Sequence, residues 1–302
     1  MTTTDKTHLD NLLPEARGIV GKSDRERIEY IESDKWIPYP RANQILEKMD
    51  ALLRAPNRSR MPNLLVVGDS NNGKTSVVKT FCRNHPPTDG LMGDAYPVVY
   101  VQAPPVPDER RFYDEIFSVL MVPFRHRDAP SQKLDDIKYY FDKIGTRMLI
   151  VDEIHNVLSG SVIRQRAFMN ALKNLGNKMM IPIVLVGTKD ALVATSTDMQ
   201  ISSRFKPIRL SLWKLDMEYA QMLASIEQTL PLKRPSKLAS RELATEIHRL
   251  SEGQIGEIVS VVSEAAVMAI KNGSERITMK EIKACEFILP SQRRTLAELE
   301  VV

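Results

Sequence analysis

The sequence is poor in cysteine, has no long apolar run and shows no large excess of one charge sign. Its two cysteines, Cys82 and Cys285, lie far apart among 302 residues, which excludes a disulfide framework and a cysteine-based zinc site. No apolar stretch approaches the roughly 20 residues of a membrane span, and the polar segment 1–10 lacks the apolar core of a signal peptide. We therefore expect a protein of the cytoplasm without a membrane partner.

The charge balance and composition are those of an ordinary globular protein. Lysine and arginine total 42 against 38 aspartate and glutamate, a formal net charge of +4, and 43% of the residues are hydrophobic. A chain of this length can bury one large core and a smaller module. The small excess of basic residues permits contact with nucleic acid without requiring it.

A glycine-rich motif of the P-loop type stands between a predicted strand, Leu64–Val67, and a predicted helix, Thr75–Phe81. The motif G-x-x-x-x-G-K-[ST] and the residue after it are Gly68, Asp69, Ser70, Asn71, Asn72, Gly73, Lys74, Thr75 and Ser76. Such a turn directs backbone N–H groups at phosphate oxygens, beside the positive end of a helix dipole. Lys74 would reach the β- and γ-phosphates, and the Thr75 hydroxyl would ligate Mg²⁺. The motif predicts a nucleoside triphosphate site.

Two carboxylates, Asp152 and Glu153, directly follow the apolar run Met148–Val151. Such a run is typical of a central parallel strand, and ligands of parallel sheets bind beyond the carboxyl ends of the strands. We therefore expect both carboxylates to face the P-loop, with Asp152 in the Mg²⁺ shell and Glu153 polarising an attacking water. An Asp-Glu pair can also simply open a helix, but a P-loop nearby favours the catalytic interpretation.

Two further polar residues, Thr188 and Arg204, stand next to predicted strands, and each permits two interpretations. Thr188 could hold the hydrolytic water or a γ-phosphate oxygen, or it could cap a helix that begins near Lys189. Arg204 could be an arginine finger offered to the γ-phosphate of a neighbouring subunit. It could equally be an ordinary surface residue, and the residues around it leave both interpretations open.

Four regions follow from the pattern along the chain: a charged extension at 1–45, a strand–helix alternation at 46–212, a helical region at 213–290 and a short loose tail at 291–302. The predicted strands are Leu64–Val67, Val98–Gln102, Met148–Val151, Ile183–Gly187 and Ile208–Leu210. Alternation of this kind indicates a parallel sheet with right-handed crossovers. We predict an α/β fold, a five-stranded parallel sheet flanked by helices, with a small C-terminal helical lid.

Capping residues mark the helices of the predicted lid. Asp216 can cap the first helix, and Ser236 or Ser240 the second. Ile255–Lys271 is the third, and Thr278 with Glu281 forms a capping box for a fourth.

Six segments carry motifs that occur together in one family. They are Trp36–Ala42, Arg60–Gly68, Asn71–Lys74, Asp152–Leu158, Gly187–Ala191 and Ser251–Glu257. From about Leu12 to Phe287 the chain resembles the TniB/TnsC transposition ATPases, which have the P-loop AAA+ fold, and among them it most resembles the short TniB-type proteins. This combination of motifs is far more specific than a P-loop alone.

The resemblance implies an ATP-dependent regulator of DNA transposition with the cofactors ATP and Mg²⁺. Such proteins assemble on double-stranded target DNA as rings or helical filaments, recruit a DDE-type transposase and a TniQ-type target selector, and disassemble on hydrolysis. The resemblance places Thr188 at the position called sensor 1 and Arg204 at the finger arginine. The segment Gly253–Glu257 has no arginine where a sensor-2 arginine usually stands, so we expect slow, assembly-dependent hydrolysis.

Contact with DNA needs basic side chains at phosphates, and the candidates lie between the second and third predicted strands. They are Arg110, Arg111, Arg125 and Arg127. In a ring or filament, loops of this region would face the central channel. For any one of these residues, a solvated charged surface is the simpler interpretation.

Two other functions fit the same motifs. A helicase loader or replication initiator would use the same ATP chemistry, although no helix-turn-helix pattern of an initiator follows Pro290. A nucleotide-gated scaffold would hardly hydrolyse ATP, and the presence of both Glu153 and Arg204 argues against it.

Overall fold

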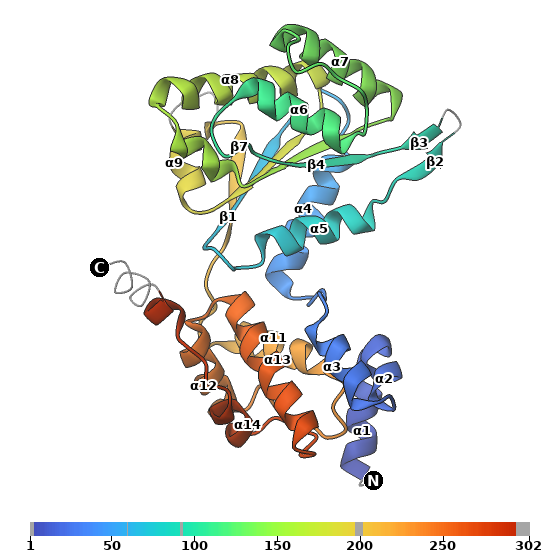
Figure 1. The fold of residues 1–302 in the computed structure, drawn as a ribbon, viewed down its shortest axis with the longest axis vertical. Helices are drawn as coiled ribbons and strands as arrows, with labels where there is room; N and C mark the ends of the chain where they lie inside the picture. Colours follow the sequence, from blue (N-terminus) through green and yellow to red (C-terminus); the bar gives the residue numbers. More distant parts are fainter. Residues whose placement is uncertain (1–2, 59, 91–92, 197–201, 294–302) are drawn as a thin grey trace. The chain divides into compact units, whose positions relative to one another are not determined.

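The computed structural model describes residues 3–58, 60–90, 93–196 and 202–293 (Figure 1). The chain divides into two compact units, one formed by Arg41–Leu210 and the other by Met1–Pro40 together with Ser211–Val302. We call the first the ATPase unit, after the activity that the sequence motifs predict, and the second the helical unit. Of the predicted loose tail, 291–302, the part from residue 294 onward lies outside the described residues.

The ATPase unit is built on a five-stranded parallel sheet with the strand order β4-β5-β6-β1-β7. The strands are β1 Asn63–Gly68, β4 Val98–Gln102, β5 Met148–Asp152, β6 Ile183–Gly187 and β7 Phe205–Leu210. Every residue of β1, β5 and β6 is buried, as expected of central strands covered on both faces. The predicted fold is confirmed, and the last strand begins earlier than predicted, at Phe205.

Helices cover both faces of this sheet. They are α4 Pro40–Leu53, α5 Lys74–Asn84, α6 Glu109–Val119, α7 Pro130–Lys143, the 3₁₀ helix η1 Ile154–Ser159, α8 Val162–Met179 and α9 Asp190–Ser196. Helices α4 and α5 lie on one face and α6, α7 and α8 on the other (Figure 1), as right-handed crossovers require. On the second face, alternate strand residues such as Leu65 and Leu149 pack against Phe112 and Phe168 to form the main core.

A short hairpin follows α5 that the sequence pattern did not indicate. Strands β2 Thr88–Gly90 and β3 Gly93–Ala95 pair antiparallel, with Thr88 opposite Ala95. Glycine and aspartate dominate these segments, and Thr88 is their one β-branched residue, so they lack the apolar alternation by which a strand is recognised.

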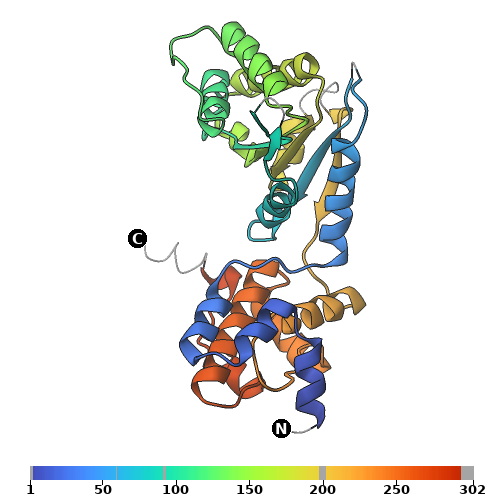
Figure 2. The ribbon, with the colours of Figure 1, turned by 90° about the vertical axis from the view of Figure 1, so that its right-hand side faces the viewer.

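The helical unit combines helices from both ends of the chain (Figures 1 and 2). These are α1 Thr3–Asn11, α2 Pro14–Val20, α3 Asp24–Glu32, α11 Met217–Gln228, α12 Arg241–Ser251, α13 Ile255–Lys271 and α14 Met279–Ala284. The Asp216 side chain caps α11 by accepting from Tyr219 N at 2.9 Å. Thr278 and Glu281 form the predicted capping box of α14, and Ser240 stands at the N-cap of α12.

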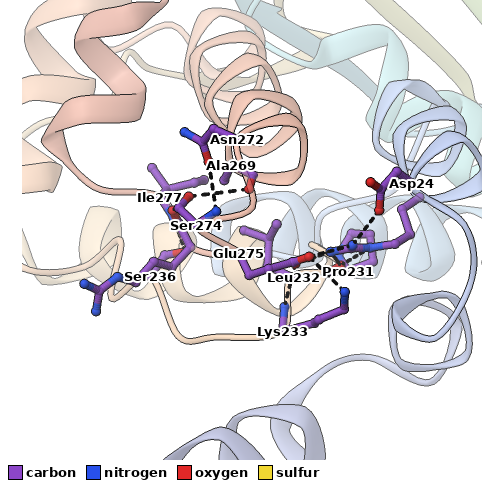
Figure 3. A network of polar contacts seen from close by, with 12 residues as sticks. Asp24, Pro231, Leu232, Lys233, Ser236, Ala269, Asn272, Ser274, Glu275 and Ile277 are labelled. Carbon is purple, nitrogen blue, oxygen red and sulfur yellow. Dashed lines mark hydrogen bonds and ion pairs between the residues drawn. The ribbon is translucent and has the colours of Figure 1, made fainter.

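A buried arginine joins the N-terminal helices to the lid, through polar contacts with Asp24, Pro231 and Glu275, which are labelled in Figure 3. Arg27 of α3 has no exposed surface. Its Nε and Nη2 atoms donate to Pro231 O at 3.0 and 2.8 Å, and Nη1 donates to the Glu275 carboxylate at 2.9 Å. Lys233 Nζ binds the same carboxylate at 2.9 Å. The segment predicted as a separate extension therefore folds in one unit with the lid, through contacts that no local sequence pattern encodes.

Among the described residues, no single helix is long and apolar enough to cross a membrane. Helices α12 and α13 reach that length and composition only as a pair, and the chain bends by 120° at the short break between them. The apolar side chains of α13 pack inside the helical unit, where Ile258, Val261 and Ala265 are fully buried.

Candidate nucleotide-binding site

The P-loop leaves β1 through a close contact with the end of β7. A Cβ atom added at Gly68 would lie 2.7 Å from Leu210 O, so a larger residue would push the two strand ends apart. Asn72 is buried, and its Nδ2 atom donates to the same carbonyl oxygen at 2.7 Å. Asn71 and Gly73 have left-handed backbones, with φ of 56° and 77°. These features fix the turn that precedes α5.

Lys74 is buried at the first position of α5, where its Nζ donates to Asp69 O at 2.8 Å. Burial lowers the pKa of Lys74, and the carboxylates of Glu153, Asp152 and Asp69 oppose that shift. The cation therefore lies among acidic groups inside the loop. Ser70 and Ser76, also predicted for this site, are exposed on either side of it.

Asp152 connects the P-loop to the neighbouring strands. Its side chain is buried at the end of β5, and its Oδ2 atom accepts from Thr75 Oγ1 and from the Tyr100 hydroxyl, both at 2.9 Å. Its Oδ1 atom accepts from Glu153 N at 2.7 Å. Burial and the adjacent Asp152 raise the pKa of Tyr100, so the phenol stays a donor. The Thr75–Asp152 pair offers oxygen atoms, the ligands that Mg²⁺ prefers.

Glu153 adopts a left-handed backbone, with φ of 56° and ψ of 32°, at the start of η1. Its Oε2 atom lies 3.2 Å from His155 Nε2, a contact the sequence pattern did not indicate. An added Cβ at Gly187 would lie 3.0 Å from Ile154 Cγ2 and 3.4 Å from His155 N. The glycine at the end of β6 therefore lets η1 approach the sheet and position the histidine beside the glutamate.

Thr188 follows β6, the strand that lies between β1 and β5. It therefore lies at the carboxyl ends of the strands, as do the P-loop and the carboxylates. Its Oγ1 atom is 3.4 Å from Asp190 Oδ2 in the first turn of α9. Next to it, Lys189 Nζ pairs with Asp69 Oδ1 at 2.8 Å. Lys189 is a cation near the phosphate loop that the motif did not include.

Arg204 lies at the amino ends of the strands, opposite to the ends that carry the P-loop and the carboxylates. It directly precedes β7, which pairs in parallel with β1 from Asn63–Phe205 to Gly68–Leu210. A strand rises about 3.3 Å per residue, so the length of β1 and β7 separates Arg204 from the P-loop by about 20 Å. Its Nη1 atom donates to Asn177 Oδ1 of α8 at 2.6 Å. The structure therefore does not bring Arg204 into the pocket of its own chain.

The four arginines predicted to contact DNA are exposed, and they lie on two adjoining segments. Arg110 and Arg111 are in the first turn of α6, and Arg125 and Arg127 are in the loop before α7. That loop folds back along α6, because His126 Nδ1 lies 3.0 Å from Asp114 Oδ2.

A family model described as "Bacterial TniB protein" matches residues 27–215, which is more than half of the chain. The chain belongs to the TniB family. No curated protein sequence matches this TniB-family chain.

Solved structures with a similar arrangement are AAA+ ATPases. Cdc6p from Pyrobaculum aerophilum is 18% identical, with 84% of this chain and 69% of that chain covered and a TM-score of 0.60. The Aeropyrum pernix ORC1 protein in complex with DNA is 13% identical, with 87% and 69% covered and a TM-score of 0.52. A Walker-type ATPase of Pyrococcus abyssi is 15% identical, with 90% and 78% covered and a TM-score of 0.52. At these identities the likeness shows that the TniB-family chain has the AAA+ ATPase fold.

Proposed function

We propose that this TniB-family chain is an ATP-dependent, DNA-binding regulator of DNA transposition that assembles as a ring or helical filament on double-stranded DNA. The proposal that the chain binds ATP rests on the contact between the P-loop and the strand that ends at Asp152. There Thr75 Oγ1 donates to Asp152 Oδ2 at 2.9 Å, and Lys74 is buried in the same loop. The family match supports the role in transposition.

In this proposal, residues 68–76 surround the phosphates of ATP, and Lys74 moves from Asp69 O to the β- and γ-phosphates. Thr75 and Asp152 would hold Mg²⁺, whose charge would offset that of the triphosphate. Glu153 polarises the attacking water, and Thr188 bonds to that water or to a γ-phosphate oxygen. Hydrolysis is slow, because Gly253–Glu257 contains no arginine to add a second cation from the lid.

The position of Arg204 supports catalysis between subunits. An arginine at the amino edge of the sheet, about 20 Å from its own P-loop, can reach a γ-phosphate only in another copy of the chain. We propose that Arg204 is the finger arginine of a homo-oligomer, acting on the nucleotide bound to the neighbouring subunit. Asn177 Oδ1, 2.6 Å from Arg204 Nη1, orients it.

The proposed partners are double-stranded DNA, a DDE-type transposase and a TniQ-type target selector, and the proposed location is the cytoplasm. Exposed Arg110, Arg111, Arg125 and Arg127 would contact DNA phosphates. Among similar structures, one contains ORC1 in complex with DNA. The transposase and the target selector follow from membership of the TniB family alone.

A second candidate is a replication-initiator or helicase-loader ATPase. The fold likeness to Cdc6p and ORC1 favours it. The family match favours the transposition role, because it covers 27–215 and so includes the whole ATPase unit.

Electron microscopy of the protein with duplex DNA, with and without a non-hydrolysable ATP analogue, tests the proposal. We expect rings or filaments on DNA that require the analogue. Addition of a TniQ-type selector and a DDE-type transposase should then give co-assembly on the same DNA. A protein that binds ATP but never assembles on DNA would contradict the proposal and leave a nucleotide-gated scaffold. Binding to a replicative helicase in place of the transposase would favour the second candidate.

A further inference from the structure

The loops that follow β4 and β5 pack tightly against each other at the carboxyl ends of the strands. Ser159 Oγ, at the end of η1, donates to Pro105 O at 2.7 Å. A Cβ added at Gly160 would lie 2.3 Å from Pro107 Cγ, so this approach requires glycine. Because α6 begins after the first loop and α8 after the second, the two helices begin next to each other.

The bodies of α6 and α8 are also packed together (Figure 1). Phe112 on α6 and Phe168 on α8 are both buried, and their rings meet edge to face with centroids 5.4 Å apart. Arg164 precedes Phe168 by one helical turn and shares its face of α8. Arg110 and Arg111 come directly before Phe112. Three arginines therefore stand at the same end of this helix pair.

The carboxylates of Asp108 and Glu109 balance only part of the positive charge of the three arginines at this end. The side chains of Arg110 and Arg164 are exposed and have no ion-pair partner among the residues that the structure describes. Arg111 Nε is 3.8 Å from Asp108 Oδ2 in an exposed pair, and such pairs are weak. The nearby Glu109 carboxylate accepts a hydrogen bond from the Tyr113 hydroxyl at 2.9 Å.

Large apolar side chains are exposed next to these arginines. Ile163 is 81% exposed, Val162 57% and Val106 39%. Duplex DNA presents a matching alternation, because phosphates border grooves that are lined by sugars and base edges. Arginines bind the phosphates, and apolar side chains contact the sugars and base edges in the grooves.

We propose that the α6–α8 surface, formed by Val106, Arg110, Arg111, Ile163 and Arg164, holds the backbone of duplex DNA. The inference rests on the proposed DNA-binding function and adds Arg164 and Ile163 to its contacts. It also connects DNA to the nucleotide. Helix η1 begins directly after Glu153 and ends just before α8, so one short segment joins the water-polarising carboxylate to the DNA contact.

The test measures the affinity for a fluorescent duplex at several salt concentrations, in the presence of a non-hydrolysable ATP analogue. The variants are Arg164→Gln alone and Arg110→Gln with Arg164→Gln. The matched control is Arg147→Gln, which removes the same charge at the exposed amino end of β5. We expect the double variant to bind on the order of ten-fold more weakly and to lower the log–log salt slope by about 2 per subunit. The control should bind like the wild type.

Two further variants separate the contribution of charge to DNA binding from that of the apolar side chains. Arg164→Lys keeps the charge and should bind like the wild type, whereas Ile163→Ser should weaken binding without changing the salt slope, because it releases no counterions. ATP affinity, measured for every variant, should be unchanged. If the wild type binds the duplex and the double variant binds it with equal affinity and slope, the inference is overturned and the proposed function stands. A wild type that binds no duplex would overturn both.

Discussion

Asp152 is fixed by donors from three parts of the ATPase unit: the Thr75 hydroxyl, the Tyr100 hydroxyl and the Glu153 amide. The P-loop motif and the apolar run before Asp152 predicted only that this carboxylate faces the P-loop. The contact with Tyr100 was not predictable, because Tyr100 meets Asp152 only through the pairing of β4 with β5. The contact of His155 with Glu153 was missed as well, since it depends on the left-handed turn at Glu153.

The replacement Lys74→Ala should abolish nucleotide binding and, with it, assembly on DNA. Lys74 is the only side-chain cation within the P-loop motif, and alanine has no group that can reach the β- and γ-phosphates. Titration with a fluorescent ATP analogue measures the loss. The control is Lys79→Ala, which removes an exposed cation from the same helix. Near-normal ATP affinity in the Lys74 variant would rule out the site.

The replacement Glu153→Gln should keep ATP affinity and lower turnover by about 10²–10⁴-fold, because an amide cannot polarise water as a carboxylate does. The amide oxygen can still accept from His155, so the local geometry is retained. We expect this variant to remain on DNA longer than the wild type. Single-turnover hydrolysis and the dissociation rate from DNA measure the two effects, and equal hydrolysis rates would refute the role of Glu153.

At the scale of elements, local sequence patterns predicted strands and capped helices well. The continuous apolar runs became β1, β5 and β6, and the capping residues mark the starts of α11 and α14. The hairpin β2–β3 was missed, because its glycines and aspartates give no strand signal. The packing of α3 in the lid was also missed, because Arg27 and Glu275 lie 248 residues apart and no local pattern connects them.

The replacement Arg27→Met should destabilise the helical unit by about 1.5–3 kcal/mol, because Glu275 and Pro231 O lose their bonds to the guanidinium while Lys233 still pairs with Glu275. Hydrogen exchange of α3 and α13 measures the effect within this unit. The control is Arg25→Gln on the same helix, whose pair with Glu29 is exposed and therefore contributes little to stability. Equal exchange in the two variants would contradict the structural role of Arg27.

The same contacts give the helical unit a dependence on pH. Burial alone would raise the pKa of Glu275, but bonds from Arg27 and Lys233 hold it below its ordinary value. A lowered folded-state pKa stabilises the fold above the unfolded-state pKa, and this stabilisation disappears as the pH falls through the folded-state value. We therefore expect acid to loosen α3 in the wild type. The Arg27→Met variant should show less of this change between neutral and acid pH.

At the scale of the whole molecule, the two regions that we propose for catalysis lie at opposite ends of the parallel strands. The P-loop and the carboxylates follow the carboxyl ends of the strands, whereas Arg204 precedes β7 at their amino ends. If Arg204 is the finger arginine, as we propose, a complete site requires two copies of the chain. The motifs predicted both halves, but the distance between them became visible only once the strand order placed β7 beside β1.

Mixing two inactive variants tests this arrangement. Arg204→Ala should bind ATP normally as a monomer and lose turnover on the order of 10³-fold, as other enzymes do without their arginine finger. When it is mixed with Glu153→Gln, some interfaces combine the intact pocket of the first variant with the arginine of the second. We expect partial recovery of ATPase activity that rises with protein and DNA concentration. A mixture that co-assembles but stays inactive would show that Arg204 does not act between subunits, and Arg209 would be the next candidate.

The discontinuous helical unit sets the order in which the chain can fold during synthesis. Ribosomes add roughly 5–20 residues per second, and 248 residues separate Arg27 from Glu275. About 10–50 s therefore pass between the synthesis of Arg27 and that of its partner Glu275. During that time the whole ATPase unit emerges as one continuous segment and can fold. Helix α3 thus leaves the ribosome well before α13, against which it packs, and until α13 has been made the apolar residues of α3 are accessible to chaperones.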